Sequence, residues 1–255
     1  GRFVLPGMVD EHVHMMDPGF TDREDWTTGT MAAARGGITT VVDHHRSEPL
    51  VYTRKILEEK TEYINSRAVV DFGQLGGIDL DNLEHLKPMW DGGALGFKGF
   101  ICELHGVPDL SEGVLLNVMR EVKTFGGTVM LHCESDSILK KAKAQIDADG
   151  RTDYMCISDW RNPESEYVAT MDAISLAELT GCTVLVAHVS QPRLLDAIHA
   201  ARERGVQIFA ESCPQYFFMD TDSLKEKGPF VKFTPVLRAP EVKDGMRAYL
   251  GQNMV

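Results

Sequence analysis

The chain alternates short apolar, β-branched runs with helix-like segments along its whole length. Alternation of this kind indicates βαβ units and a parallel sheet. Most helix-like segments end at glycine, as in Arg35-Gly36-Gly37 and Arg204-Gly205, which is a common helix stop. The predicted strands are Met8–Val13, Gly37–Val42, Ala68–Phe72, Ala94–Phe100, Thr128–His132, Thr183–Val189 and Val206–Ala210. The predicted helices include Asp25–Arg35, Pro49–Tyr63, Glu112–Phe125, Glu164–Leu179, Arg193–Arg204 and Glu241–Leu250.

Histidine or lysine stands at or just after the end of several of these runs: His12, His14, Lys98, His132 and His188. An open doubly wound sheet and a (β/α)8 barrel both fit the alternation. Only a closed barrel gathers the ends of so many strands around one point. Spacing agrees, because a barrel unit takes roughly 30 residues. His14 and Lys98 are 84 positions apart, Lys98 and His132 are 34 apart, and a polar excursion at 147–166 lengthens the next interval. The sequence therefore predicts an α/β, TIM-type (β/α)8 barrel.

A complete barrel needs an eighth strand, and the sequence supplies seven candidates. After Val206–Ala210 come a loop with two prolines and the last predicted helix. An unclosed barrel would leave two sheet edges exposed, which is an aggregation liability. We therefore expect residues 1–255 to be one hydrolase-type barrel domain without its last strand, from the central part of a longer protein.

Composition narrows the class of protein. The 255 residues carry a net charge of -12 without any basic stripe, which disfavours nucleic-acid binding. No run of 18 apolar residues and no signal-peptide pattern occur, so we expect a soluble, cytoplasmic protein with no membrane partner. The five cysteines are scattered and form no CxxC pair, which argues against a disulfide framework and a thiolate zinc site.

The strand-end residues suit metal binding better than a core. On a strand, His12 and His14 point to the same side, because side chains alternate. Neutral imidazoles suit zinc, and also manganese, cobalt or iron. Lys98 cannot bind a metal as an ammonium. A buried, neutral lysine can react with carbon dioxide to form a carbamate, which would act as a carboxylate bridging two ions. Two such ions would activate a shared hydroxide near neutral pH. Taken singly, each histidine would more often be an ordinary polar residue, and Lys98 an ordinary surface lysine, but the whole set at strand ends favours a metal site.

Several motifs resemble the amidohydrolase superfamily, and within it the cyclic amidohydrolases, which comprise allantoinases, hydantoinases/dihydropyrimidinases and dihydroorotases. The matching segments are Leu5-Pro6-Gly7-Met8-Val9-Asp10, His12-Val13-His14, Asp17-Pro18-Gly19, Gly36-Gly37-Ile38-Thr39-Thr40, Gly96-Phe97-Lys98, Leu131-His132-Cys133-Glu134, His188-Val189-Ser190 and Glu211-Ser212-Cys213-Pro214. The resemblance implies that a metal-bridging hydroxide attacks a ring amide carbonyl. It also implies His12, His14, carboxylated Lys98, His132 and His188 as ligands of two divalent ions, most simply zinc.

The choice of substrate within this family follows from finer matches. Dihydroorotases carry an arginine where this chain has Met16, and hydantoinases place a tyrosine soon after the lysine, whereas none occurs between Lys98 and Tyr154. The chain therefore looks most similar to allantoinases, which implies an allantoin-like ureide or hydantoin-like cyclic amide as substrate. His44 and Arg46 could contact that substrate, or could have ordinary loop roles.

One element of the family pattern is missing. These enzymes use a catalytic aspartate at the end of the eighth strand, and none of Asp196, Asp220, Asp222 and Asp244 has its sequence context. We expect that aspartate beyond Val255, so that this segment alone would be inactive. We also expect residues 1–255 to lack the family's flanking β-sandwich. The resemblance implies a homo-oligomer, commonly a tetramer. Alternatives left open are a hydantoinase/dihydropyrimidinase, a non-catalytic dihydropyrimidinase-related assembly protein, and another metallo-hydrolase such as a deaminase or phosphotriesterase-like enzyme.

Overall fold

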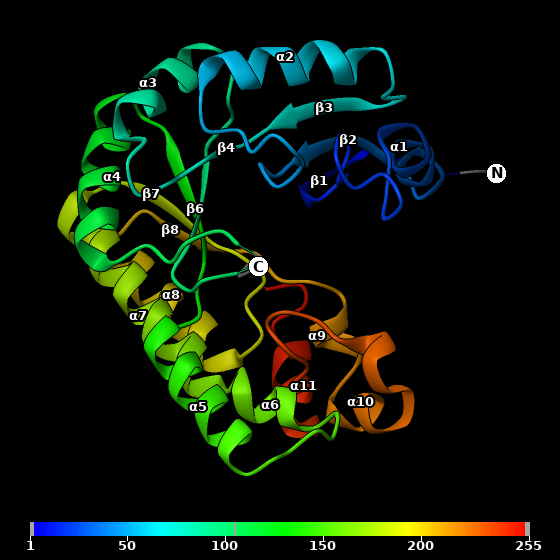
Figure 1. Ribbon diagram of the computed structural model, residues 1–255, viewed down its shortest axis with the longest axis vertical. Helices are drawn as coiled ribbons and strands as arrows, with labels where there is room; N and C mark the ends of the chain where they lie inside the picture. Colours follow the sequence, from blue (N-terminus) through cyan, green and yellow to red (C-terminus); the bar gives the residue numbers. More distant parts are fainter. Residues whose placement is uncertain (1–2, 105, 253–255) are drawn as a thin grey trace. The chain divides into compact units, whose positions relative to one another are not determined.

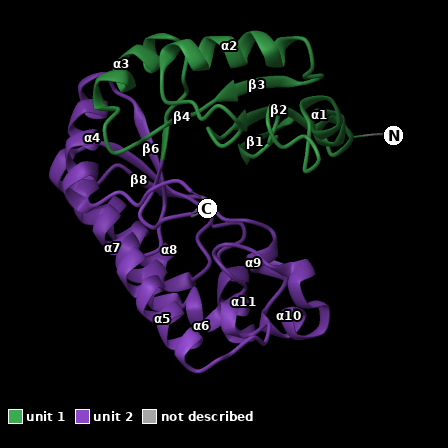
Figure 2. Cartoon of the chain, in the orientation of Figure 1, with its two compact units in different colours: residues 1–98 green, residues 99–255 purple. Residues whose placement is uncertain are grey.

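A computed structural model describes residues 3–104 and 106–252 of the chain. It divides into two units, Gly1–Lys98 and Gly99–Val255, which are coloured separately in Figure 2. Parallel strands alternate with helices in both, as the sequence predicts (Figure 1). The prediction that residues 1–255 form one barrel domain stays a prediction.

The first unit is built on three parallel strands in the order β1-β2-β3. Its core packs Trp26 of helix α1 against Met15, Val41 and Ile64. Helix α1 begins where the Asp25 side chain accepts a hydrogen bond from the Thr28 amide. The strands of this unit are β1 (Met8–Val13), β2 (Ile38–Asp43), β3 (Asp71–Gln74) and β4 (Gly76–Gly77). Its helices are α1 (Trp26–Arg35), α2 (Arg54–Asn65) and α3 (Leu83–Asp91).

Strand β4 holds the start of β5 (Phe97–Phe100) in place. Gly76 pairs with Phe97 and Gly77 pairs with Lys98, in parallel register. A side chain at residue 77 would not fit, because its Cβ would lie 2.5 Å from the Tyr52 ring and 2.6 Å from the His45 ring. Glycine thus allows this strand to approach two aromatic side chains of the loop that follows β2.

The second unit contains three further parallel strands, β6 (Thr128–His132), β7 (Thr183–Val186) and β8 (Ile208–Ala210), in that order. Helix α4 packs on β6, α7 on β7 and α8 on β8 (Figure 1). The helices of this unit are α4 (Glu112–Thr124), α5 (Asp136–Ala148), α6 (Cys156–Trp160), α7 (Pro163–Thr180), α8 (Pro192–Glu203), α9 (Gln215–Phe218), α10 (Thr221–Lys227) and α11 (Pro240–Arg247), with the 3-10 helix η1 (Gly228–Val231).

All seven predicted strands are present; β1 and β6 have the predicted bounds, the other five have shifted ends, and the short β4 was not predicted. The run predicted at Ala68–Phe72 begins as a strand only at Asp71, because the Ala68 amide bonds the Ile64 carbonyl at the end of α2. Gly181 ends α7 in the left-handed conformation, as its position after Thr180 predicts. The last predicted helix ends at Arg247 instead of Leu250. Between β8 and residue 252 the structure describes no further strand.

Two further expectations concern cysteines and membranes. None of the five cysteines forms a disulfide. Among the described helices, none combines the length and the apolar composition required to span a membrane.

Candidate functional site

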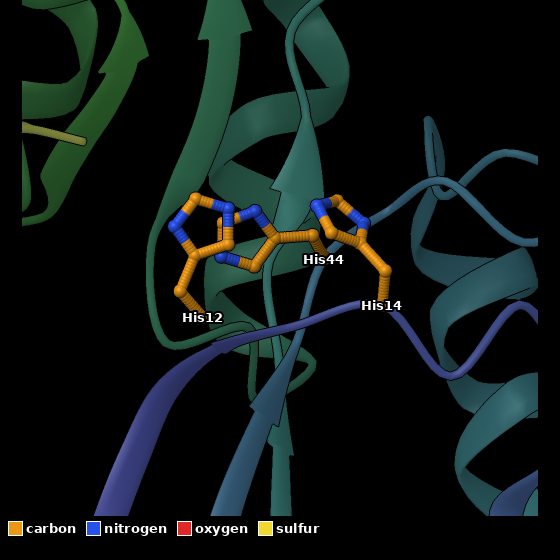
Figure 3. A group of neighbouring side chains, drawn as sticks. All are labelled: His12, His14 and His44. Carbon is orange, nitrogen blue, oxygen red and sulfur yellow. The ribbon is translucent and has the colours of Figure 1, made fainter. Parts of the chain in front are cut away.

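Three histidines of the first unit lie together at the ends of β1 and β2 (Figure 3). His12 and His14 come from the end of β1, and His44 follows β2 directly. The His12 and His44 rings stack with centroids 3.8 Å apart, and the His14 ring lies 5.3 Å from that of His12. One nitrogen from each ring lies within 4.8 Å of the others, so that the three imidazoles can reach a single ion. We name these three residues the first histidine cluster.

Two members of the first histidine cluster, His14 and His44, have lowered pKa values, which favours the neutral form that binds metals. Burial lowers the pKa of His44 well below its usual value, and the charges of His12 and Lys98 lower it further. The pKa of His14 is lowered by the same causes, although part of its surface is exposed. The Nδ1 atom of buried His44 has no hydrogen-bond partner among the described residues. Its Nε2 atom lies 3.4 Å from the Glu11 carbonyl oxygen, so Nδ1 is the nitrogen that suits an added metal ion.

Lys98 belongs to the same unit and is almost fully buried, with 1% of its surface exposed. Its register opposite Gly77 is fixed by the β4–β5 pairing. The pKa of His45 is lowered mainly by burial and next by the positive charge of Lys98. The same charge also lowers the pKa values of His14 and His44. The structure thus brings the predicted residues His12, His14 and Lys98 into one unit, with His44 beside them.

His132 and His188 meet in the second unit. His132 is the last residue of β6 and His188 follows β7. The His132 Nδ1 atom lies 2.9 Å from the His188 Nε2 atom, and both rings are buried. His188 has a φ of 44°, in the left-handed region that non-glycine residues seldom occupy. Strain of this kind must be sustained by the surrounding contacts, and it is commonly found at functional sites.

His132 is hydrogen-bonded to the carboxylate of Glu134, which is in turn paired with Arg161. The Glu134 Oε2 atom lies 2.6 Å from His132 Nε2, and Arg161 Nη1 donates to the same oxygen at 2.5 Å. Burial raises the pKa of Glu134, but the bond from His132 and the charge of Arg161 leave it lowered overall. Cys102 lies close enough to form a possible ligand set with His132 and Glu134. Burial and the Glu134 charge raise the pKa of the Cys102 thiol to about 12, so the thiol is protonated near neutral pH.

A second buried ion pair supports the chain after His188. Glu166 of α7 accepts bonds from the Ser190 amide at 2.8 Å and the Ser190 hydroxyl at 2.5 Å. Arg238 donates from Nη2 to Glu166 and from Nε to Ser190, at 2.9 Å each. Sequence reasoning missed Arg161, Glu166 and Arg238, because no local motif marks them. Glu134 could have been recognised from the sequence, since it is the last residue of the family-like segment Leu131-His132-Cys133-Glu134.

The remaining predicted residues have defined positions. Arg46 is partly buried in the loop after β2, where burial and then the charge of Arg23 lower its pKa. Asp196 lies on α8 and accepts a bond from Tyr249, and Asp220 caps α10. Asp196 and Asp220 thus have structural partners. The prediction that the catalytic aspartate lies beyond Val255 stays a prediction.

Comparison with known proteins identifies relatives of the whole chain. Residues 3–214 match the model of the amidohydrolase family. The allantoinases of Salmonella paratyphi B and Salmonella newport are each 33% identical over 96% of this chain. The L-hydantoinase (dihydropyrimidinase) from Arthrobacter aurescens is 31% identical and superposes over 98% of this chain with a TM-score of 0.93. The dihydropyrimidinase from Brevibacillus agri is 29% identical, with a TM-score of 0.85 over 98% of this chain.

These matches confirm the predicted α/β barrel class, since the chain shares the fold of the hydantoinase over nearly all its length. The chain spans 56% of the length of the curated allantoinases and 56% of the hydantoinase structure.

Proposed function

Because the chain belongs to the amidohydrolase family, we propose that it carries the metal-binding part of an enzyme that hydrolyses a cyclic amide. The observation that supports this most directly is the first histidine cluster, in which three imidazoles converge while their surroundings keep two of them neutral. Allantoinase and hydantoinase relatives agree with ring-opening chemistry. The chain covers about half of those proteins, so its activity is inferred by analogy with them.

We propose His12, His14, Lys98, His132 and His188 as the protein ligands of two divalent ions, with zinc as the preferred metal. The donor set fits, since imidazole nitrogens and a carboxylate-like oxygen are typical zinc ligands. When bound, the ions would supply a nucleophilic water near neutral pH and polarise the amide carbonyl. His44 lies in the first histidine cluster and is a candidate for either metal or substrate contact.

Lys98 is proposed to bind as its carbamate, formed with carbon dioxide. The Lys98 side chain is buried, and in its ammonium form its charge lowers the pKa values of His14 and His44. The ammonium would first lose a proton to solvent, the neutral amine would then form a bond to carbon dioxide, and loss of a second proton would leave the carbamate. A carbamate would replace this positive charge by a negative one, which favours binding of cations nearby. Replacing Lys98 with methionine should then reduce the zinc content measured per chain, whereas an unchanged content would refute the assignment.

The substrate is proposed to be an allantoin-like cyclic ureide. His44 and Arg46 supply nitrogen donors in the loop after β2, which suit the carbonyl oxygens of a ureide. A hydantoin or dihydropyrimidine is the second candidate, because the solved relatives include L-hydantoinase and dihydropyrimidinase. The protein is proposed to act in the cytoplasm as a homo-oligomer, commonly a tetramer in similar enzymes.

The test combines metal analysis with substrate assays on the protein as the cell makes it. We expect two zinc ions per chain and ring opening of allantoin that exceeds ring opening of hydantoin and dihydrouracil. Turnover of hydantoin or dihydrouracil alone would favour the second candidate. Much less than one metal ion per chain, with no ring opening, would refute the enzyme and favour a non-catalytic assembly protein. Activity on phosphotriesters alone would also refute the proposal.

A further inference from the structure

Four charged side chains are buried behind His132 and His188 in the second unit: Glu134, Arg161, Glu166 and Arg238. We name them the buried charge quartet. Each keeps at most 6% of its surface exposed. Burying charges is costly unless they are well paired, and apolar residues of similar size often serve stability equally well. We therefore expect the quartet to have a role besides stability. Its hydrogen bonds connect to His132 and to the segment after His188.

The first contact fixes which nitrogen of His132 carries a proton. The Glu134 Oε2 atom accepts a bond from Arg161 Nη1 at 2.5 Å, and a carboxylate oxygen paired with a guanidinium in this way acts as an acceptor. The His132 Nε2 atom, 2.6 Å from Glu134, must then be the donor. In neutral His132 the lone pair is left on Nδ1, the atom that lies 2.9 Å from His188 Nε2. The bond from Glu134 thus leaves the lone pair of His132 on Nδ1, the nitrogen that faces Nε2 of His188.

The second contact holds the segment that follows His188. Both oxygens of Glu166 bind Ser190, through its amide and its hydroxyl. Gln191 donates a third bond to Glu166 at 2.6 Å. These bonds begin two residues after His188, whose φ of 44° requires support from its surroundings. Glu166 therefore stabilises the backbone that places the His188 ring.

Arg238 joins the two halves of the quartet. Its Nη1 atom donates to the Arg161 carbonyl at 2.7 Å, and its Nη2 atom donates to Glu166 at 2.9 Å. Arg161 in turn donates to Glu134. A continuous set of hydrogen bonds thus runs from His132 through the quartet to the segment after His188.

We propose that the buried charge quartet positions His132 and His188 for metal binding, with Glu134 fixing the Nε2-protonated tautomer of His132. This inference rests on the metal site proposed above. In this proposal Glu134 acts through His132, because its Oε2 atom is shared by His132 and Arg161. Carboxylates that bind the second nitrogen of a metal-bound histidine orient the ring and raise its basicity.

The tautomer can be measured without any variant of Glu134. The chelator-treated protein is labelled with nitrogen-15 and studied at pH 8 by two-bond nitrogen–proton correlation. His132 is assigned by comparison with His132→Gln. We expect the His132 proton on Nε2. A proton on Nδ1 in the metal-free protein would overturn the proposal.

Zinc affinity, measured by competition with a chromogenic chelator, tests the positioning role. We expect Glu134→Ala to weaken one zinc site roughly 10- to 100-fold. Glu134→Gln should weaken it less, because its carbonyl oxygen still accepts a bond from Nε2. The matched control is Glu178→Gln, since Glu178 forms an exposed pair with Arg204 at 3.4 Å. Its zinc affinity should equal that of the unchanged protein.

Each outcome decides the question. Wild-type zinc affinity in a folded Glu134→Ala protein would overturn the positioning role while leaving the proposed metal site intact. If that variant does not fold, Glu134→Gln decides, and equal affinity with wild type would overturn the role. Absence of zinc binding by the unchanged protein would refute the metal site itself. Zinc binding that depends on Glu134, without ring opening of any cyclic amide, would refute the proposed activity alone.

Discussion

Asp43, the last residue of β2, should make the stability of the metal-free protein depend on pH. Its carboxylate is buried and accepts a hydrogen bond from the Met15 amide at 3.0 Å. Burial raises its pKa from 3.8 to about 7, and the Met15 bond and the Lys60 charge only partly offset this. We expect Asp43→Asn to remove this dependence, because an amide oxygen can still accept the Met15 bond but cannot ionise.

The size of the effect follows from the pKa. Between 3.8 and about 7 the folded protein keeps a proton on Asp43 that the unfolded chain has lost. Stability therefore falls as pH rises through this window, by about 1.4 kcal/mol per pH unit. From pH 5 to pH 8 the loss is about 2.6 kcal/mol, and above pH 8 the cost is nearly fully present. The residue is nearly inaccessible to solvent, so screening does not reduce this figure greatly.

The assay is urea unfolding of wild type and Asp43→Asn at pH 5 and pH 8, with a chelator present because a nearby cation would favour the carboxylate. The free energy of unfolding of the variant, relative to wild type, should rise by about 2–3 kcal/mol between the two values. Other titrating groups are common to both proteins and cancel. Asp71→Asn, the same change at an exposed position, should show no such rise. An equal difference at both pH values for Asp43→Asn would refute the reasoning.

Three other predictions concern packing, buried charge and metal. Gly77→Ala should lower the free energy of unfolding by about 1–3 kcal/mol in urea melts, since its Cβ would meet the Tyr52 ring at 2.5 Å. Gly113→Ala, in the first turn of α4, should instead raise it by about 0.5–1 kcal/mol, because the nearest atom to the added Cβ is Ser111 Oγ at 3.9 Å. Arg238→Met should lower the free energy of unfolding by about 3–5 kcal/mol in the same melts, because it leaves buried Glu166 without its cation. The control is Arg204→Met, which removes an exposed ion pair and should change the free energy of unfolding by under about 1 kcal/mol. Zinc at 100 times its dissociation constant should raise the unfolding free energy by about 2.7 kcal/mol, which a chelator should reverse; no rise would contradict a folded-state metal site.

The sequence predicts those features that depend on local pattern. Apolar periodicity located every described strand except the two-residue β4 (Gly76–Gly77), and glycines located helix ends such as Gly181, because both signals reflect the conformation of a few consecutive residues. The positions of His12, His14, Lys98, His132 and His188 at or near strand ends follow from the same local pattern, while their role as ligands stays a prediction. His132 and His188, 56 positions apart, do meet at 2.9 Å.

The supporting contacts could not be predicted in this way. Arg161 meets Glu134 across 27 positions, and Arg238 meets Glu166 across 72. Such pairs depend on the packing of α7 and of the segment after η1, and neither arginine lies in a motif. The stacking of His44 on His12 was also missed, because it depends on the pairing of β1 with β2 and not on either strand alone.

The charges around the first histidine cluster differ from those around His132 and His188, and this difference supports the proposed carbamate of Lys98. His132 is backed by the Glu134 carboxylate, which favours a cation at its other nitrogen. Around the first histidine cluster, the charged neighbours that most affect the pKa values are themselves cations: Lys98 acts on His14 and on His44, and Arg46 also acts on His14. A divalent ion bound there would be repelled unless a negative charge appeared close by. Conversion of Lys98 to a carbamate would change its charge from positive to negative, supplying an anion to the unit that needs it. Zinc binding and carboxylation at the first cluster should therefore depend on each other.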